Sequence, residues 1–217
     1  MSRLPGGAVD AAAPGGATVR AALRAATDPI HARLHDLPGF RALAEGRLDR
    51  AAYADLLCRL LGFHRAVEAA LDAAPSLAPW GIDVAARRRA WLIEADLQSL
   101  GAAPCPVASI APLPPLGSAA RALGCLYVTE GSTLGGRHLA RALDGLLPPG
   151  RTGRRFLLGH GDAHAAMWRA CCQALEACGA DPARRAAMLT AAAATFAAFE
   201  AWFTPARGGV ALPPAAG

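Results

Sequence analysis

Three glycines stand within a segment that otherwise has the composition of a helix. The segment runs from Leu126 to Leu143, and its glycines are Gly131, Gly135 and Gly136. An interior helical glycine costs about 1 kcal/mol relative to alanine, so three of them require a compensating role. Their spacing predicts one side of the helix without side chains. Two roles fit this pattern: tight packing against another helix or turn, and close approach of a flat, bulky ligand.

Two histidines near the N-terminus are candidate metal ligands. His31 and His35 are four residues apart, so on a continuous helix they share a face. Both could be ordinary surface or core side chains, or a zinc pair, although the His-Glu-x-x-His pattern and a third ligand are missing. One of them could instead be the axial ligand of a haem. Arg24 lies two turns before His31, where it could hold a carboxylate of the ligand.

The composition predicts an all-α protein with one domain. The chain has 217 residues, enough to bury a full core, and much of its 53% hydrophobic content is alanine. Aromatic and β-branched residues, which favour strands, are few. We expect one helical domain over residues 18–205, between a disordered tail at 1–17 and a flexible tail at 206–217.

Proline and glycine divide this domain into blocks of helical periodicity. Helices are expected at about 18–36, 49–73, 84–100, 117–147, 160–179 and 181–203, with a proline-rich connection at 102–117. Pro29 falls inside the first block. It either starts a helix after a cap at Asp28 or kinks a continuous one.

Charge and hydropathy argue against several classes of protein. The net charge is +5, all basic residues are arginine, and they are scattered, so nucleic-acid binding is not expected. No run of about 18 uncharged apolar residues and no signal pattern is present, which predicts a cytoplasmic protein without a membrane span. The six cysteines form no Cys-x-x-Cys pair, and we expect them to be reduced and buried.

Four segments together resemble the bacterial biliverdin-producing haem oxygenases, especially those associated with bacteriophytochromes. They are Leu23–Leu34, Leu61–Glu68, Trp91–Gly101 and, most specifically, Leu123–Gly136 with its Tyr-Val-Thr-Glu-Gly-Ser-Thr-Leu-Gly-Gly sequence. The resemblance spans about residues 20–203. It implies an all-α, single-domain haem oxygenase-like helical bundle, with haem between a proximal helix and a glycine-rich distal helix.

The resemblance also implies roles for individual residues. His31 would be the proximal iron ligand, and His64 would lie near the distal polar network. The distal helix would be formed by Gly131, Ser132, Gly135 and Gly136, and the haem propionates would meet Arg24 and Tyr127. From its position in the sequence we expect Arg137 to add charge nearby. Position 35 is commonly acidic in such enzymes, so the histidine found here leaves His35 as a competing ligand for iron.

The implied activity is the degradation of haem b, which is both substrate and cofactor, to biliverdin, iron and carbon monoxide. It requires O2 and electrons from a donor such as a ferredoxin or flavin reductase, and biliverdin could pass to a bacteriophytochrome. Distal glycines suit this reaction because they place no strong acid or base over the iron. The alternatives are a haem carrier or sensor without turnover, a thiaminase-like protein of similar fold, and a structural helical domain.

Overall fold

The computed structural model describes residues 17–103, 105 and 113–204, and all regular secondary structure in this part of the chain is helical. This confirms the all-α prediction. The α-helices are α1 (Val19–His35), α2 (Pro38–Ala44), α3 (Arg50–Asp72), α4 (Ala90–Ser99), α5 (Ala119–Arg141), α6 (Arg155–Leu158), α7 (His164–Cys178) and α8 (Pro182–Phe203). Short 3-10 helices lie at η1 (Ala78–Trp80), η2 (Ala85–Arg87) and η3 (Gly161–Ala163).

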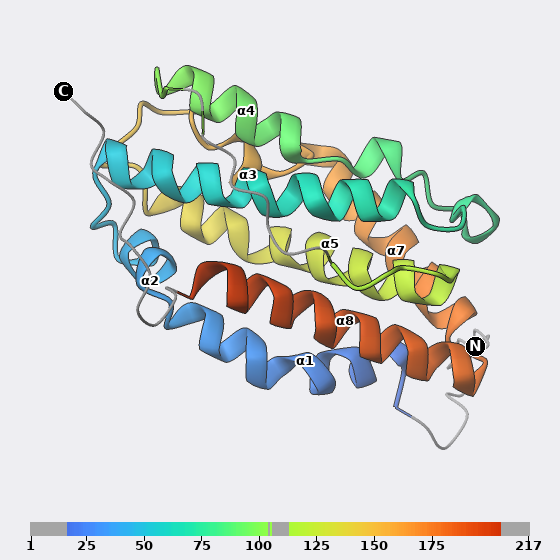
Figure 1. The fold of residues 1–217 in the computed structure, drawn as a ribbon. Helices are drawn as coiled ribbons and strands as arrows, with labels where there is room; N and C mark the ends of the chain where they lie inside the picture. Colours follow the sequence, from blue (N-terminus) through green and yellow to red (C-terminus); the bar gives the residue numbers. More distant parts are fainter. Residues whose placement is uncertain (1–16, 104, 106–112, 205–217) are drawn as a thin grey trace, which may run out of the picture.

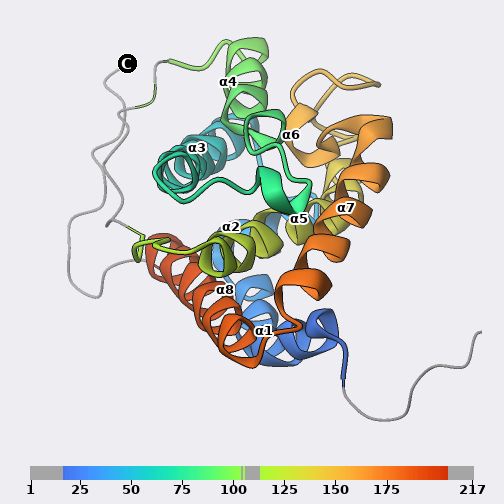
Figure 2. The same cartoon turned by 90° about the vertical axis from the view of Figure 1, so that its right-hand side faces the viewer.

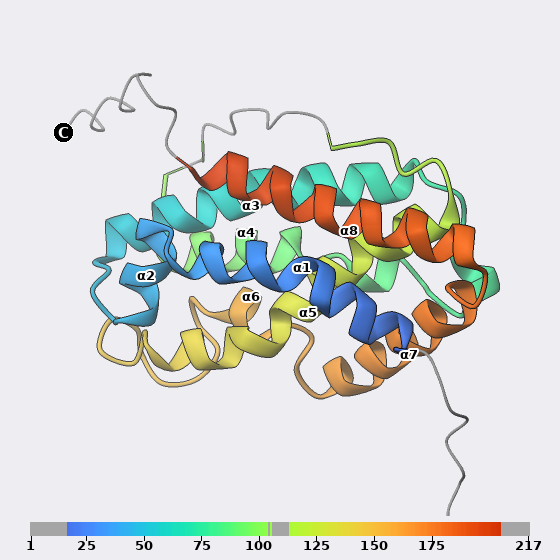
Figure 3. The same ribbon diagram turned by 90° about the horizontal axis from the view of Figure 1, so that it is seen from below.

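The central helix of the bundle is α5, which packs against α8, α7 and α6. Figures 1 and 3 show α1 alongside α8, and α3 alongside α4. Seen from the end of the bundle, α7 lies to one side of α5, with α1 and α8 together below (Figure 2). The buried side chains form two clusters. One joins α1, α7, α8, the second half of α3 and the first half of α5, and the other joins the first half of α3, α4, α6 and the ends of α5 and α8.

Helix α1 continues through its proline. Pro29 lies inside the helix, which begins at Val19 with the Thr18 hydroxyl accepting a hydrogen bond from the Ala21 N–H. Of the two predicted alternatives, the structure therefore has the continuous helix. Because the helix is continuous, His31 and His35 lie on adjacent turns of one face, with ring centroids 4.8 Å apart.

Several predicted boundaries were wrong. The structure adds α2 and α6, which are too short to show a helical period, and α4 begins at Ala90 because a 3-10 turn occupies Ala85–Arg87. The glycine-containing helix was predicted over 117–147 but spans Ala119–Arg141. The predicted tails lie outside the described residues except for Ala17.

Helix α8 is the one described helix that is long and apolar enough to cross a membrane by length and composition alone. It packs against both α1 and α5 and contributes Met188, Ala192 and Phe196 to the core. Its apolar composition is therefore accounted for by packing within the bundle.

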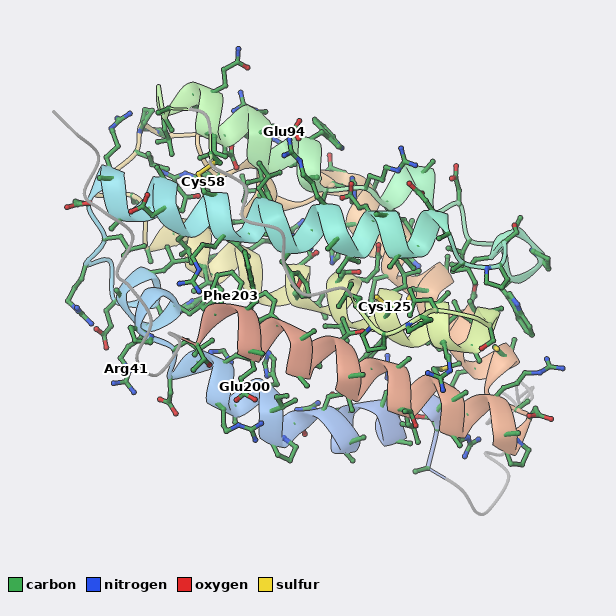
Figure 4. All side chains as sticks on the ribbon, in the orientation of Figure 1. Arg41, Cys58, Glu94, Cys125, Glu200 and Phe203 are labelled. Carbon is green, nitrogen blue, oxygen red and sulfur yellow. A yellow bond between two sulfur atoms is a disulfide. The ribbon has the colours of Figure 1, made fainter. Side chains whose placement is uncertain are left out.

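The expectation that every cysteine is reduced was also wrong. Cys58 of α3 and Cys105 form a disulfide with a Cα–Cα distance of 5.6 Å (Figure 4). The bond ties the segment after α4 to the middle of α3. The remaining cysteines, which are Cys125, Cys171, Cys172 and Cys178, are free. Spacing could not reveal the pair because 47 residues separate its members.

Removing this cross-link should destabilise the fold. Closing a loop of 47 residues lowers the entropy of the unfolded chain by an amount worth about 4 kcal/mol. We expect Cys105→Ser to lower the free energy of unfolding by up to that amount, measured by urea denaturation without reductant. Cys172→Ser, at a half-buried free thiol, is the matched control. Equal stability of the two variants would show that the cross-link contributes nothing.

Candidate functional site

Helix α1 is fixed at both ends. The Glu176 carboxylate of α7 accepts hydrogen bonds from the Val19 and Arg20 N–H groups, at 2.8 and 3.0 Å, which also places a negative charge at the helix N-terminus. Nearer the C-terminus, the Arg33 guanidinium donates to both oxygens of Glu200 on α8, at 2.6 and 2.9 Å (Figure 4). This paired geometry orients the guanidinium as well as attracting it. The turn that carries His31 is therefore held between two anchors.

His31 lies on an exposed turn of α1, with the Phe196 ring centroid 5.9 Å away. Partial burial and the neighbouring His35 lower the pKa of His31, while Asp28 opposes this shift. The imidazole is consequently neutral at neutral pH and has a lone pair for a metal. No group of three or more His, Cys, Asp or Glu side chains in the described residues could hold a metal ion.

One face of α5 is closed at its start and open further along. Gly124, Gly131 and Gly135 are separated by seven and four residues, so they lie on nearly the same face. A Cβ atom at Gly124 would lie 2.3 Å from the Met188 carbonyl of α8, so this glycine permits close helix packing. At Gly131 the nearest atom would be Trp168 Cη2, at 3.7 Å, and at Gly135 nothing lies within 4 Å.

Gly136 has a different role from Gly135. A Cβ atom there would lie 2.2 Å from the Leu157 carbonyl oxygen, so Gly136 allows α6 to pack against α5. The prediction that all three glycines form one bare side was therefore wrong for Gly136. Of the two predicted roles, Gly136 fulfils close packing, and Gly135 leaves the backbone accessible. We call Gly131 and Gly135 the bare face of α5.

One turn before these residues a side chain of α5 reaches α1. Tyr127 of α5 is half-buried, and its phenol lies beside Thr27 of α1. Burial raises the pKa of the Tyr127 phenol, and the neighbouring Thr27 side chain opposes the rise. Because α1 and α5 run in the same direction (Figure 1), the next turns carry His31 and Gly131. The exposed Arg24 lies one turn before this contact on α1. Its Nε atom is 3.6 Å from Asp28 Oδ2.

Two surface hollows lie elsewhere. Their volumes are about 610 and 490 Å³, and the first is lined by Leu71–Asp72, residues 74–78 and residues 81–85. The second lies among Trp80, the start of α5 and the start of α8. Neither contains a predicted site residue. A flat ligand bound by His31 would rest on an exposed helix face rather than in one of these hollows.

A family model described as Heme oxygenase matches residues 17–205 of the chain. The chain belongs to the haem oxygenase family. A heme oxygenase of Xanthomonas campestris pv. campestris (strain 8004) is 34% identical over 164 residues, which cover 73% of this chain and 93% of that protein. The activity of the family is the degradation of haem, and this chain is accordingly a haem oxygenase enzyme.

Solved structures support the same fold. The NO- and CO-bound heme oxygenase of Neisseria meningitidis has a TM-score of 0.70 and 25% identity, covering 89% of this chain and 96% of that one. Heme oxygenase-1 of Synechocystis sp. PCC6803 in complex with heme has a TM-score of 0.66 and 18% identity, with coverages of 86% and 91%. The heme oxygenase of Leptospira interrogans has a TM-score of 0.69 and 17% identity, covering 86% of this chain and 98% of that one.

In this haem oxygenase the exposed Ser132 is held by a buried arginine that sequence reasoning missed. Ser132 donates its hydroxyl proton to the Thr129 carbonyl at 2.8 Å and accepts a hydrogen bond from Arg89 at 3.2 Å. Arg89 also donates to the carbonyls of Thr129 and Phe156, and its guanidinium lies 4.3 Å from the Phe156 ring centroid. Burial lowers the pKa of Arg89 to about 10, so it stays charged at neutral pH.

His64 lies in the core beside this arginine. Its side chain is only 5% exposed, and its ring contacts Phe63 and Phe156 at centroid distances of 5.9 and 4.9 Å. Burial and the charge of Arg89 hold the pKa of His64 well below its usual value. His64 is therefore a neutral, buried residue, and its role near a distal polar network stays a prediction.

A buried ion pair also supports α5. Glu130 forms an ion pair with Arg87 at 2.9 Å, and Arg87 also donates to the Met167 carbonyl of α7. His160 and His164 lie near this pair, and burial lowers the pKa of both. The Glu-Gly-Ser sequence quoted above contains Glu130, but nothing in it indicates a partner more than 40 residues earlier in the chain.

Arg137 does not extend towards the bare face. It is exposed, and its guanidinium donates to the Gly161 carbonyl of η3 at 3.4 Å. The short α6 behind Gly136 is fixed by Asp96, which is fully buried and accepts hydrogen bonds from the Arg155 and Phe156 N–H groups, both at 2.9 Å. Thus the predicted residues Gly131, Ser132 and Gly135 share one stretch of α5, whereas Arg137 lies at its contact with η3.

The two adjacent glycines should respond oppositely to alanine. Gly135→Ala should raise the free energy of unfolding by about 1 kcal/mol, because space is free and alanine favours the helix. Gly136→Ala should lower it by about 1–3 kcal/mol, because the methyl group collides with the Leu157 carbonyl. Urea denaturation of the haem-free protein measures both. Destabilisation by Gly135→Ala would contradict an open face.

His64 should make stability depend on pH. Below about pH 6.5 the unfolded chain protonates this residue, whereas the folded protein keeps it neutral, so stability should fall as the pH falls from 6.5 towards 5. The contribution is at most about 1.4 kcal/mol per pH unit. Urea denaturation at several pH values should give a shallower dependence for His64→Leu, in which the other histidines remain. Parallel curves for the two proteins would count against a depressed pKa.

Proposed function

We propose that this enzyme binds b-type haem between His31 of α1 and the bare face of α5, and converts it to biliverdin with release of iron and carbon monoxide. The observation that carries the proposal is the change along one face of α5. That face packs on α8 at Gly124, contacts α1 at Tyr127, and is open at Gly135. The exposed His31 lies one turn beyond the same contact on the parallel helix α1.

The residues at this site suit a flat dianion with a central iron. The neutral His31 imidazole supplies a metal ligand, and Arg24 and the Tyr127 hydroxyl supply partners for the two propionates. By anchoring the propionates, these two residues would set the in-plane orientation of the ring. His35 stays a neighbour of the ligand, since its ring packs edge-on against that of His31.

Bound haem supplies an iron that binds and reduces O2, together with the porphyrin carbon that is oxidised. The chain contributes a distal wall without an acid or base: Gly131 and Gly135 offer backbone, and the Ser132 hydroxyl is fixed by Arg89. This wall disfavours the proton delivery by strong side-chain acids that promotes O–O cleavage in peroxidases. It also allows the backbone to approach the ring closely enough to restrict where O2 can lie.

The reaction requires external electrons, which we assign to a ferredoxin or a flavin reductase. We place the enzyme in the cytoplasm, where both kinds of donor are found, and propose that a bacteriophytochrome receives the biliverdin. Support for this last step is the resemblance of residues 123–136 to the bacteriophytochrome-associated enzymes.

The direct test loads the protein with ferric haem, adds ascorbate in air, and follows the Soret band with extraction of the products. We expect the band to disappear as biliverdin forms. His31→Ala should lose the axial imidazole, which resonance Raman spectroscopy detects as loss of the iron–histidine vibration, and should lose turnover with it. His35→Ala is the matched control on the same face and should retain both.

Two outcomes would contradict the proposal. A stable haem spectrum with ascorbate and with a protein donor would indicate a carrier rather than an oxygenase. Loss of the iron–histidine vibration in His35→Ala, but not in His31→Ala, would show that His35 rather than His31 binds the iron.

A further inference from the structure

Two features reduce the backbone hydrogen bonding of α1 just before His31. Pro29 lies inside the helix and has no N–H, so it cannot donate to the Ala25 carbonyl, and such a proline is a usual place for a helix to bend. The buried Thr27 hydroxyl donates to two carbonyls of the preceding turn, at 2.8 and 3.3 Å, which also favours bending. The last turns of α1, which carry His31, therefore depend on other contacts for their orientation.

Arg33 spans the turn that begins at this proline. Its Nη1 atom donates to the Pro29 carbonyl at 3.3 Å, while its Nε and Nη2 atoms donate to the two carboxylate oxygens of Glu200 on α8. One guanidinium thus binds both the first carbonyl of the turn and the neighbouring helix, and His31 lies between its two attachment points in the sequence. Because the guanidinium is a rigid planar fork, it fixes the orientation of the turn relative to α8.

Helix α8 also contacts the His31 ring, one turn before Glu200. The Phe196 ring meets it edge-on, with centroids 5.9 Å apart and ring planes at 75°. Phe196 and Glu200 are four residues apart, so they lie on the same face of α8. The Arg33 side chain is 56% exposed, and exposed ion pairs contribute little to stability. The main effect of this pair is therefore on the geometry of the turn.

We propose that Arg33 and Glu200 are positioning residues for the iron ligand, because they hold the turn after Pro29 against α8 and orient the His31 imidazole before haem binds. This inference rests on the proposed function, in which His31 binds the iron. Groups that orient a metal ligand from outside its shell typically change metal affinity by about 10–100-fold when they are lost. A turn free to bend at Pro29 would also offer His35, whose ring centroid is 4.8 Å from that of His31.

The test uses the full-length protein with and without haem. Resonance Raman spectroscopy of the ferrous complex measures the iron–histidine stretching band, and transfer of ferric haem to apomyoglobin measures the dissociation rate. Arg33→Ala and Glu200→Gln should each shift or split the band and raise the dissociation rate about tenfold. In the haem-free protein, Arg33→Ala should speed amide hydrogen exchange at residues 30–35, since the turn loses its attachment to α8.

Arg65→Ala is the matched control. It removes an exposed arginine that pairs with a carboxylate of a neighbouring helix, Glu94 at 2.8 Å, and it should leave the band and the dissociation rate at their wild-type values. The exchange of Arg33→Glu with Glu200→Arg restores a pair between α1 and α8, so it should return the band towards its wild-type position. Circular dichroism of each variant reports whether the helices remain folded.

Either of two results overturns the positioning role while His31 stands as the iron ligand. One is a wild-type band and dissociation rate in both Arg33→Ala and Glu200→Gln, whatever their stability, and the other is an equal change in Arg65→Ala. Absence of any iron–histidine band from the wild-type complex overturns the proposed function and the positioning role together, and it is seen without any of these variants.

Discussion

The close packing of α8 against α5 at Gly124 determines where the open part of α5 begins. A side chain at this position would collide with the Met188 carbonyl, so only glycine lets the two helices approach so closely. Tyr127 of α5 then lies beside Thr27 of α1. Beyond this contact the same face of α5 has no covering atoms at Gly135. One helix therefore provides core packing in its first half and, in the proposed site, a ligand-binding wall in its second.

A helix with an uncovered glycine face needs support from its other side. Gly136 provides part of this support by letting α6 approach, and Asp96 fixes the start of α6 through two backbone hydrogen bonds. The buried pair of Arg87 and Glu130 supplies more, because losing either partner would leave an uncompensated buried charge, at a cost of about 3–5 kcal/mol. Both walls of the proposed site are thus held by contacts outside it, as precise ligand geometry requires.

The sequence predicted the long helices because their hydrophobic periods extend over many turns, and it placed His31 and the bare face through local motifs. It could not separate Gly135 from Gly136, since adjacent glycines look alike until the neighbouring helix is in place. It also missed Arg89 and the pairing of Cys58 with Cys105. Such contacts join residues about 40 or more positions apart, and only the packing of α3, α4 and α5 brings them together.

The most direct test of the central claim is paramagnetic broadening in amide NMR spectra of the protein bound to ferric haem, compared with the complex of zinc protoporphyrin. Unpaired electrons on the iron broaden signals from nearby nuclei only. The account predicts that the signals of His31, Gly131 and Gly135 disappear together, while those of residues in the hollow at 74–78 and 81–85 persist. Broadening centred on that hollow, with His31 and Gly135 unaffected, would contradict it.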